Sequence, residues 1–215
     1  MIDELLVATG NAGKAKEFRE MLGNGASGGG VTWRSLADYT PGGDVEETGT
    51  TFRANACLKA STYARRHNVW TLADDSGLEV DVLNGSPGVL SARWAQHNGT
   101  GKGDADNNAT LLRQLENVPD DRRTARFVCV LALSDPEGRI ILTARDTVEG
   151  RILCQSRGAN GFGYDPLFLV DGTDRTSAEM SPDEKHAISH RGKALRQLKE
   201  LMIQHKLLGA SKERE

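Results

Sequence analysis

The order of strand-like and helix-like segments along the chain most constrains its fold. Short segments at residues 5–8, 31–35 and 69–73 have the length and composition of strands. Between them lie one helical pattern that ends at Gly23 and a second over residues 51–67. Strands that alternate with helices in this way predict an α/β sheet.

The second half of the chain adds a long hairpin. Five residues, Ala125, Phe127, Cys129, Leu131 and Leu133, alternate along one face, Asp135-Pro136-Glu137-Gly138 predicts a turn, and residues 140–148 predict the returning strand. Together with the first half, this hairpin predicts a mixed α/β sheet with a partly separate second lobe. The chain has no internal repeat and no interdomain linker, so residues 1–215 are expected to form a single domain.

Three further helices are expected in the second half. One covers residues 104–115, and the side chains predicted to face inward are Ala105, Ala109 and Leu112. Ser181-Pro182-Asp183-Glu184 has the form of a capping box with proline at the first helical position, which predicts a helix start. The last helix is expected to follow Gly192.

Composition and charge exclude several classes of protein. The net charge of −3 argues against a general nucleic-acid-binding protein, which usually has a strongly basic balance. The chain begins with acidic residues, has no signal-peptide pattern and contains no apolar run near the ~18–20 residues of a membrane span. Cys57, Cys129 and Cys154 form no CxxC pair, which indicates free, mostly buried thiols in a reducing compartment. We therefore expect a soluble cytoplasmic protein that binds neither nucleic acid nor membranes.

A glycine loop between the first strand and the first helix is a candidate phosphate site. Its residues are Thr9, Gly10, Asn11, Ala12, Gly13 and Lys14. Backbone amides at the start of a helix attract anions, and Lys14 adds positive charge beside them. The loop lacks the GxxxxGKS/T spacing of a P-loop, and an ordinary glycine turn before a helix explains the same residues.

Two aspartates follow the third strand-like segment. Asp74 and Asp75 precede Ser76 and Gly77, and the Asp-Ser-Gly sequence predicts a turn. Neighbouring strand residues face opposite sides, so we expect one carboxylate, that of Asp75, at the strand end where ligands of α/β sheets bind. Solvated loop aspartates are the alternative without a function.

Glu46 and Glu47 provide a second acidic group, ahead of the helix at residues 51–67. They could join Asp75 in a Mg²⁺ site, because Mg²⁺ prefers oxygen ligands and is often held by one or two carboxylates plus phosphates. Acidic residues near a helix start also favour the helix dipole without having any other function.

The loop Gly161-Phe162-Gly163-Tyr164-Asp165 is a candidate base site. Aromatic rings beside glycines can stack on a planar base while the backbone approaches closely. Asp165 could then bind the edge of the base. An aromatic turn packed on the core is the alternative.

Lys185 and the segment Ser189-His190-Arg191-Gly192 place basic side chains at a junction between two helices. Such groups can hold phosphates or donate to a purine oxygen, although a solvated basic helix face has the same composition. A zinc site at His186 and His190 is not supported, because the sequence has neither an HExxH motif nor a cysteine partner there.

Taken in order, these segments resemble the inosine/xanthosine triphosphate pyrophosphatase (HAM1-like) family, whose members hydrolyse noncanonical purine nucleotides. The resemblance covers nearly the whole chain, and the joint order of the segments is specific although each one alone is modest. The matching segments are Ala8 to Lys14, Glu46 to Gly49, Asn55 to Ala60, Ala73 to Gly77, Pro87 to Arg93, Gly161 to Pro166 and Glu184 to Gly192. Two segments look longer than in the family, the glycine/serine loop at residues 23–30 and the charged tail after Leu208.

The resemblance implies an elongated α/β fold with two lobes around a central mixed sheet, and a homodimer. It implies Mg²⁺-dependent hydrolysis of ITP, dITP and XTP to the monophosphate and pyrophosphate, which cleanses the nucleotide pool. Carried over by position, Asp75 is the catalytic carboxylate and shares the metal with Glu46 or Glu47. The implied substrate-binding residues are Thr9, Gly10, Asn11, Ala12, Gly13, Lys14, Ser76, Phe162, Gly163, Tyr164, Asp165, Lys185, His190 and Arg191.

The predicted chemistry is attack of water on the α-phosphorus, with pyrophosphate as the leaving group. Asp75 would orient or deprotonate the water, and Lys14 with Mg²⁺ would offset charge on the leaving group. A donor such as His190 or Arg191 would favour the 6-oxo group of inosine and xanthosine over the 6-amino group of adenine. The alternatives are a nucleotide-binding protein without activity, a Maf-type enzyme acting on pyrimidine or modified nucleotides, and a plain phosphatase.

Overall fold

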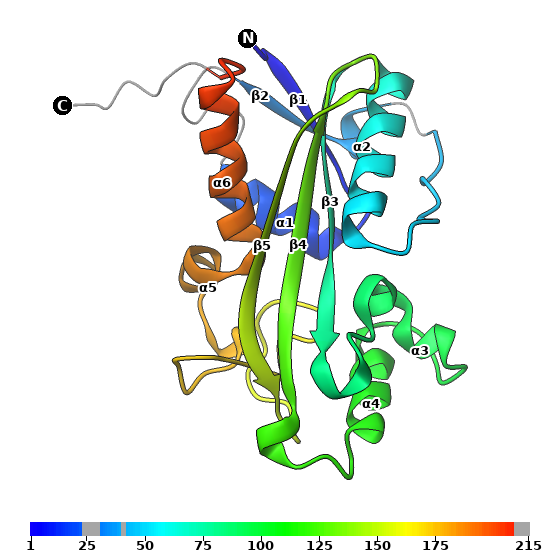
Figure 1. Ribbon diagram of the computed structural model, residues 1–215, viewed down its shortest axis with the longest axis vertical. Helices are drawn as coiled ribbons and strands as arrows, with labels where there is room; N and C mark the ends of the chain where they lie inside the picture. Colours follow the sequence, from blue (N-terminus) through cyan, green and yellow to red (C-terminus); the bar gives the residue numbers. More distant parts are fainter. Residues whose placement is uncertain (23–30, 40–41, 209–215) are drawn as a thin grey trace, which may run out of the picture. The chain divides into compact units, whose positions relative to one another are not determined.

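The computed structural model describes residues 1–22, 31–39 and 42–208 (Figure 1). The loop at residues 23–30 and the tail after Leu208, both expected to be longer than in the family, lie outside these residues. Six strands of the described part form one sheet in the order β2-β1-β3-β4-β5-β6. Their bounds are β1 (Glu4–Ala8), β2 (Thr32–Ser35), β3 (Trp70–Val80), β4 (Thr124–Ser134), β5 (Ile140–Ile152) and β6 (Phe168–Val170).

The sheet is mixed, which confirms the predicted fold class. β1 pairs in parallel with β2 and β3, whereas β5 pairs antiparallel with β6. β4 and β5 are neighbours joined by the predicted turn, in which the Asp135 N–H donates to the Arg139 carbonyl at 3.0 Å. The returning strand β5 continues to Ile152, beyond its expected end, and the short strand β6 has no counterpart in the sequence prediction.

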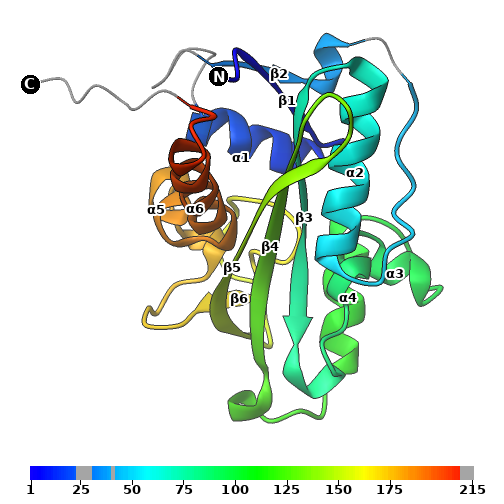
Figure 2. The same cartoon turned by 45° about the horizontal axis from the view of Figure 1, so that its top comes forward.

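Helices flank the strands, and α2 and α6 lie on opposite sides of them (Figure 1 and Figure 2). The helices are α1 (Ala12–Leu22), α2 (Phe52–His67), α3 (Trp94–His97), α4 (Asp104–Gln114), α5 (Pro182–Ile188) and α6 (His190–Gln204). The predicted capping box starts α5, because the Ser181 side chain accepts from the Glu184 N–H and Glu184 accepts from the Ser181 N–H. No helix of the described residues has the length and apolar character needed to cross a membrane.

The chain forms two compact units that interleave along the sequence. The first unit comprises Met1–Asp75, Val130–Arg145 and Gly192–Glu215, and the second comprises Ser76–Cys129 and Asp146–Arg191. The chain passes from one unit to the other inside β3, β4, β5 and α6, so each crossing lies within a regular element.

Each unit buries its own set of apolar side chains. Buried residues of the first unit include Leu5, Leu6, Phe18, Ala56, Ala60, Leu72, Leu131, Leu133, Ala194 and Leu198. A cluster in the second unit contains Leu78, Leu111, Leu115, Phe127, Val148, Ile152, Leu167 and Phe168. Full burial of one such large side chain stabilises the fold by about 1.5–3 kcal/mol. The three cysteines are free as predicted, but Cys57 is only half-buried and Cys154 is exposed.

The predicted turn at Asp75-Ser76-Gly77 is wrong, because β3 continues through these residues to Val80. A later loop packs directly against Gly77. A Cβ atom at Gly77 would lie 2.6 Å from the Gly88 carbonyl oxygen, and the Leu78 N–H donates to Ser91 Oγ at 2.9 Å. The glycine therefore permits a close approach of chain to chain rather than a reversal of direction.

The predicted inward face of α4 is right for Leu112, which is half-buried and packs against the core of the second unit, but wrong for its two alanines. Ala105 and Ala109 are exposed, whereas the buried residues are Asn107, Thr110 and Leu111. Asn107 is buried because its amide oxygen accepts from the Ala95 N–H at 2.8 Å and its amide nitrogen donates to the Ala92 carbonyl at 3.2 Å. The inward face of α4 thus contains a polar residue that makes hydrogen bonds to buried backbone groups. A pattern based on apolar residues alone places alanines there instead.

Candidate active site

The predicted phosphate loop joins β1 to α1 and has a defined local structure. The Asn11 N–H donates to Thr9 Oγ1 at 3.2 Å, and the Lys14 N–H donates to Asn11 Oδ1 at 3.0 Å. Asn11 thus caps the first turn of an eleven-residue helix. All six residues of the loop are exposed or half-buried, so an anion can reach this helix start.

Lys14 of this loop forms a buried ion pair with Asp74. Lys14 Nζ lies 2.6 Å from Asp74 Oδ1, and the two side chains are 13% and 0% exposed. Removing one partner from such a pair leaves an uncompensated buried charge and costs about 3–5 kcal/mol. Lys14 therefore has a structural partner on β3 in addition to its predicted role toward phosphate.

Asp75 pairs with a different lysine, which the sequence analysis did not identify as a site residue. Lys59 Nζ of α2 lies 3.1 Å from Asp75 Oδ1 and 2.5 Å from Glu47 Oε1. Although burial opposes it, the Asp75 and Glu47 carboxylates raise the pKa of the Lys59 ammonium, which stays charged. Glu47 and Asp75 are thus brought to one ammonium group, whereas Glu46 is exposed.

The Asp75 carboxyl group has an unusual electrostatic environment. Burial raises the pKa of Asp75 from 3.8 to about 6, although the Lys59 and Lys14 ammonium groups act in the opposite direction. Its second oxygen, Oδ2, is buried and has no hydrogen-bond partner within the described part of the chain. A buried carboxylate oxygen without a partner is costly unless a ligand completes it.

These residues fit a divalent cation such as Mg²⁺. The Asp75 oxygen without a partner and the nearby Glu47 carboxylate provide two hard oxygen ligands, and Mg²⁺ commonly takes its remaining ligands from phosphates and water. Within residues 1–22, 31–39 and 42–208, no group of three histidine, cysteine or acidic residues forms a metal site of protein ligands alone.

A stability measurement tests the environment of Asp75 without any substrate. Because the pKa of Asp75 is raised in the folded chain, its ionisation between pH 3.8 and about 6 destabilises the fold. We expect Asp75→Asn to stabilise the metal-free protein at pH 7.5 by roughly 1–3 kcal/mol, which is several degrees in Tm. Thermal unfolding in a chelator measures this difference, which should vanish below pH 3.8. An Asn variant no more stable than the parent at pH 7.5 would contradict it.

The second unit gathers the other predicted residues, beginning with Asp165. Lys185 Nζ lies 2.6 Å from Asp165 Oδ2, and both side chains are less than 10% exposed. The same oxygen accepts from the Phe162 N–H at 2.9 Å. Gly161 has a φ of +76°, and a Cβ atom there would collide with the Asp165 carboxylate. The aromatic loop therefore folds around this carboxylate.

Basic side chains surround the Phe162 ring. Lys185 Nζ lies 5.2 Å from the ring centroid, and the Arg191 guanidinium carbon lies 6.0 Å from it. Arg191 is buried and donates to Ser76 Oγ at 2.7 Å. This contact places Ser76, directly after Asp75 on β3, in the basic cluster of the second unit.

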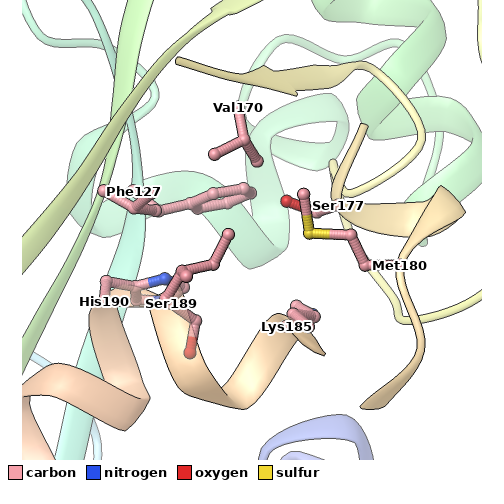
Figure 3. Close-up of a pocket in the computed structure, with 9 residues that line it drawn as sticks. Phe127, Val170, Ser177, Met180, Lys185, Ser189 and His190 are labelled. Carbon is pink, nitrogen blue, oxygen red and sulfur yellow. The ribbon is translucent and has the colours of Figure 1, made fainter. Parts of the chain in front are cut away.

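His190 stacks on Phe127, an aromatic residue that the sequence analysis did not single out. The ring centroids are 5.0 Å apart and the planes differ by 16°. Beside this pair is a small cavity, into which Phe127, Val170 and Met180 project (Figure 3). Its lining is mainly apolar, with Lys185, Ser189 and His190 supplying polar groups along one side (Figure 3). The cavity has about 10 Å³ of space for a water molecule, so in this structure it has room for one water and not for a purine base.

Gly163 and Tyr164 support the loop in which they lie. Tyr164 is buried and its hydroxyl donates to the Ser91 carbonyl at 2.9 Å, and burial raises the pKa of the phenol. The Gly163 N–H donates to Asp104 Oδ2 at 2.7 Å, and its carbonyl accepts from Asn108 at 2.9 Å. Both residues are therefore fixed to neighbouring segments of the second unit.

Known proteins share this sequence and fold. The family model for the Ham1 family matches residues 5–201. A dITP/XTP pyrophosphatase of Exiguobacterium sibiricum is 52% identical over 195 residues, which are 91% of this chain and 94% of that protein. The Staphylococcus aureus Ham1 protein has a similar structure, with a TM-score of 0.79, 39% identity, and coverage of 94% of this chain and 99% of that one. A HAM1 protein from Coxiella burnetii gives a TM-score of 0.80 and 40% identity, covering 95% of this chain and all of the other. The chain therefore belongs to the Ham1 family, as its ordered motifs predict.

Proposed function

We propose that this chain hydrolyses dITP, XTP and ITP to the nucleoside monophosphate and pyrophosphate. The relative from Exiguobacterium sibiricum that is 52% identical over 91% of this chain is named a dITP/XTP pyrophosphatase. The observation that carries the proposal is the buried Asp75 carboxyl, which has a raised pKa, an oxygen without a partner and a lysine shared with Glu47. Carboxyl groups of this kind are frequent at catalytic sites.

Glu47 and Asp75 are the residues we assign to Mg²⁺. When bound, the ion would supply positive charge that stabilises the phosphate oxygens during displacement. Lys14 and the amides of the loop at residues 9–14 would bind the triphosphate, because they combine a helix start with an ammonium group. Lys59 would keep the two carboxylates ionised and close together.

In the reaction, Asp75 would accept a proton from the attacking water. The water oxygen forms a bond to the α-phosphorus, the bond from this phosphorus to the bridging oxygen breaks, and pyrophosphate leaves with that electron pair. A pKa of about 6 makes Asp75 a stronger base than an ordinary aspartate while leaving it ionised at pH 7.5. Lys14 would offset the charge that develops on pyrophosphate.

The basic and aromatic cluster of the second unit would bind the purine. Phe162 offers a ring for stacking, and His190 and Arg191 offer donors for a 6-oxo group. Adenine presents an amino group at this position and would leave a buried donor unpaired, at a cost of about 1–3 kcal/mol. That difference favours hypoxanthine and xanthine over adenine.

A glycine substitution tests the base site. Gly161→Ala would push the Asp165 carboxylate away from Lys185 and Phe162, so we expect the KM for dITP to rise roughly tenfold or more. Gly172→Ala is the matched control, since Gly172 has the same φ of +76° but a Cβ atom there meets nothing within 4 Å. Steady-state kinetics with both variants measure this KM. Equal KM values for the Gly161 and Gly172 variants would show that Asp165 is not part of the base site.

We also propose that the protein works in the cytoplasm as a homodimer of single-domain subunits, without nucleic acid or membrane partners. The net charge of −3 supports the expectation that nucleic acid is not a partner. Light scattering coupled to gel filtration measures the mass in solution, and a monomer would contradict the dimer.

The test of the proposed function is a substrate panel. Purified protein would be incubated with Mg²⁺ and, separately, dITP, XTP, dGTP, dATP and dCTP. We expect monophosphate and pyrophosphate from dITP and XTP and little from the other three. Preference for dCTP would favour the Maf-type alternative, and binding of dITP without turnover would favour a nucleotide-binding protein.

A further inference from the structure

Residues 42–49, which carry Glu47, form an extended segment that we call the strap. Gly42 and Gly43 are exposed, and from Asp44 to Gly49 burial alternates with a period of two. The half-buried residues are Val45, Glu47 and Gly49, and the exposed ones are Asp44, Glu46 and Thr48. Such alternation indicates an extended chain with one side against a neighbour, although the strap is not part of the sheet.

The neighbour is one face of α2. Every second residue of the strap, from Gly43 to Gly49, contacts a side chain from this helix. The contacts are Gly49 N–H to Asn55 Oδ1 at 2.7 Å, Lys59 Nζ to Glu47 Oε1 at 2.5 Å, Val45 N–H to Tyr63 Oη at 3.3 Å, and Arg66 to the Gly43 carbonyl at 2.6 Å. The strap therefore runs antiparallel to α2, and all of these residues belong to the first unit.

The spacing of residues along α2 and along the strap explains why their contacts stay in register. Asn55, Lys59 and Tyr63 are four residues apart, which is about 6 Å along a helix axis. Two residues of an extended chain span about 6.6 Å. Each turn of α2 therefore lies beside every second residue of the strap. The difference between the two spacings is small enough that the contacts stay aligned over this short length.

Glycines at both ends bring the strap close to the helix. A Cβ atom at Gly49 would lie 2.5 Å from Asn55 Oδ1, and one at Gly42 would lie 2.7 Å from Arg66 Cδ. Asn55 is fully buried, so its contact with the Gly49 backbone is shielded from water. Tyr63 is also buried and lies under the Arg66 guanidinium, 5.1 Å from the ring centroid.

We propose that Asn55, Tyr63 and Arg66 are positioning residues that hold the strap on α2 and thereby fix Glu47 beside Asp75. The inference rests on the proposed function, in which Glu47 and Asp75 hold Mg²⁺. An irregular segment loses conformational entropy when metal binding orders it. Hydrogen bonds that already hold the backbone of the strap in the metal-free protein reduce that loss. These three side chains make hydrogen bonds with the backbone of the strap, so they would set the affinity for the cation rather than the rate of the chemical step.

A tyrosine variant tests the strap. Tyr63→Phe removes only the hydroxyl that accepts from the Val45 N–H. Tyr39→Phe is the matched control, because it also removes one hydroxyl, which donates to Glu4 at 2.6 Å, and leaves the strap contacts intact. Hydrogen exchange of the metal-free proteins measures the protection of the strap amides. Calorimetric titration of each protein with Mg²⁺, in the presence of the non-hydrolysable α,β-imido analogue of dITP, measures the affinity of the protein for the ion.

We expect Tyr63→Phe to exchange the amides of residues 43–49 faster and to bind Mg²⁺ roughly tenfold more weakly, with kcat at saturating Mg²⁺ within about twofold of the parent. Tyr39→Phe should match the parent in all three measurements. Unchanged exchange, or faster exchange with unchanged Mg²⁺ affinity, would overturn the positioning role. Absence of Mg²⁺ binding by the parent protein would instead overturn the proposed function, while the exchange data would still show whether Tyr63 holds the strap.

Discussion

Replacing Asp75 with asparagine is expected to lower kcat for dITP by roughly a thousandfold. Asparagine keeps the size of the side chain but cannot accept the proton of the attacking water. It also removes the charge of the carboxylate assigned to the metal. Steady-state release of pyrophosphate at saturating Mg²⁺ measures the effect, and near-normal turnover would show that Asp75 has no catalytic role.

Asp81→Asn provides the control for that loss. Asp81 also belongs to an ion pair, 2.8 Å from Arg126, but it is exposed and lies at the surface of the second unit. Surface pairs of this type contribute about 0–1 kcal/mol, so this variant should keep its activity and most of its stability. The contrast would separate the loss of the Asp75 carboxylate from a general effect of removing charge.

Replacing Lys14 with methionine is expected to have the second largest effect. The change leaves Asp74 as a fully buried charge without its lysine and should destabilise the fold by about 3–5 kcal/mol. It also removes the ammonium group from the phosphate loop, so the KM for dITP should rise at the same time. Urea unfolding and steady-state kinetics measure the two effects.

The double variant Lys14→Met with Asp74→Asn separates the two roles of Lys14. Neutralising both partners removes the buried charge, so most of the lost stability should return. The affinity for dITP should remain weak, because the positive charge at the loop is still absent. Recovery of both properties together would show that Lys14 acts only through the fold.

Much of the fold follows from local signals in the sequence. The helical pattern before Gly23 gives α1, and the pattern over residues 51–67 gives α2 with Thr51 as its N-cap. The Asp-Pro-Glu-Gly turn gives the hairpin of β4 and β5, and the Ser181 capping box gives α5. In each case the residues that fix the element lie within a few positions of one another.

The errors occur where distant contacts override a local preference. Asp75-Ser76-Gly77 has the composition of a turn, but the approach of Ser91 and Gly88 to Gly77 accompanies an uninterrupted strand. The inward face of α4 depends on Asn107, whose burial is explained by the two backbone groups that it satisfies. Neither contact has a signal at short range in the sequence.

The sequence motifs of the candidate site could be predicted, but the contacts between their side chains could not. Lys59 lies in an ordinary amphipathic helix, and its contacts with Asp75 and Glu47, both distant in the sequence, are what give the lysine a role. Phe127, on which His190 stacks, lies in a strand whose apolar residues alternate. A residue that contacts the candidate site from such a strand has the same sequence pattern as one that packs only in the core.

Hydrolysis of dITP in H₂¹⁸O with Mg²⁺ tests the central claim most directly. Attack of water on the α-phosphorus, with Asp75 as the base, places the ¹⁸O label in dIMP and leaves the pyrophosphate unlabelled. Mass spectrometry of the two products distinguishes them. Label in dIMP at one oxygen per turnover is the expected result, and labelled pyrophosphate, or labelled orthophosphate with dIDP, would contradict the account.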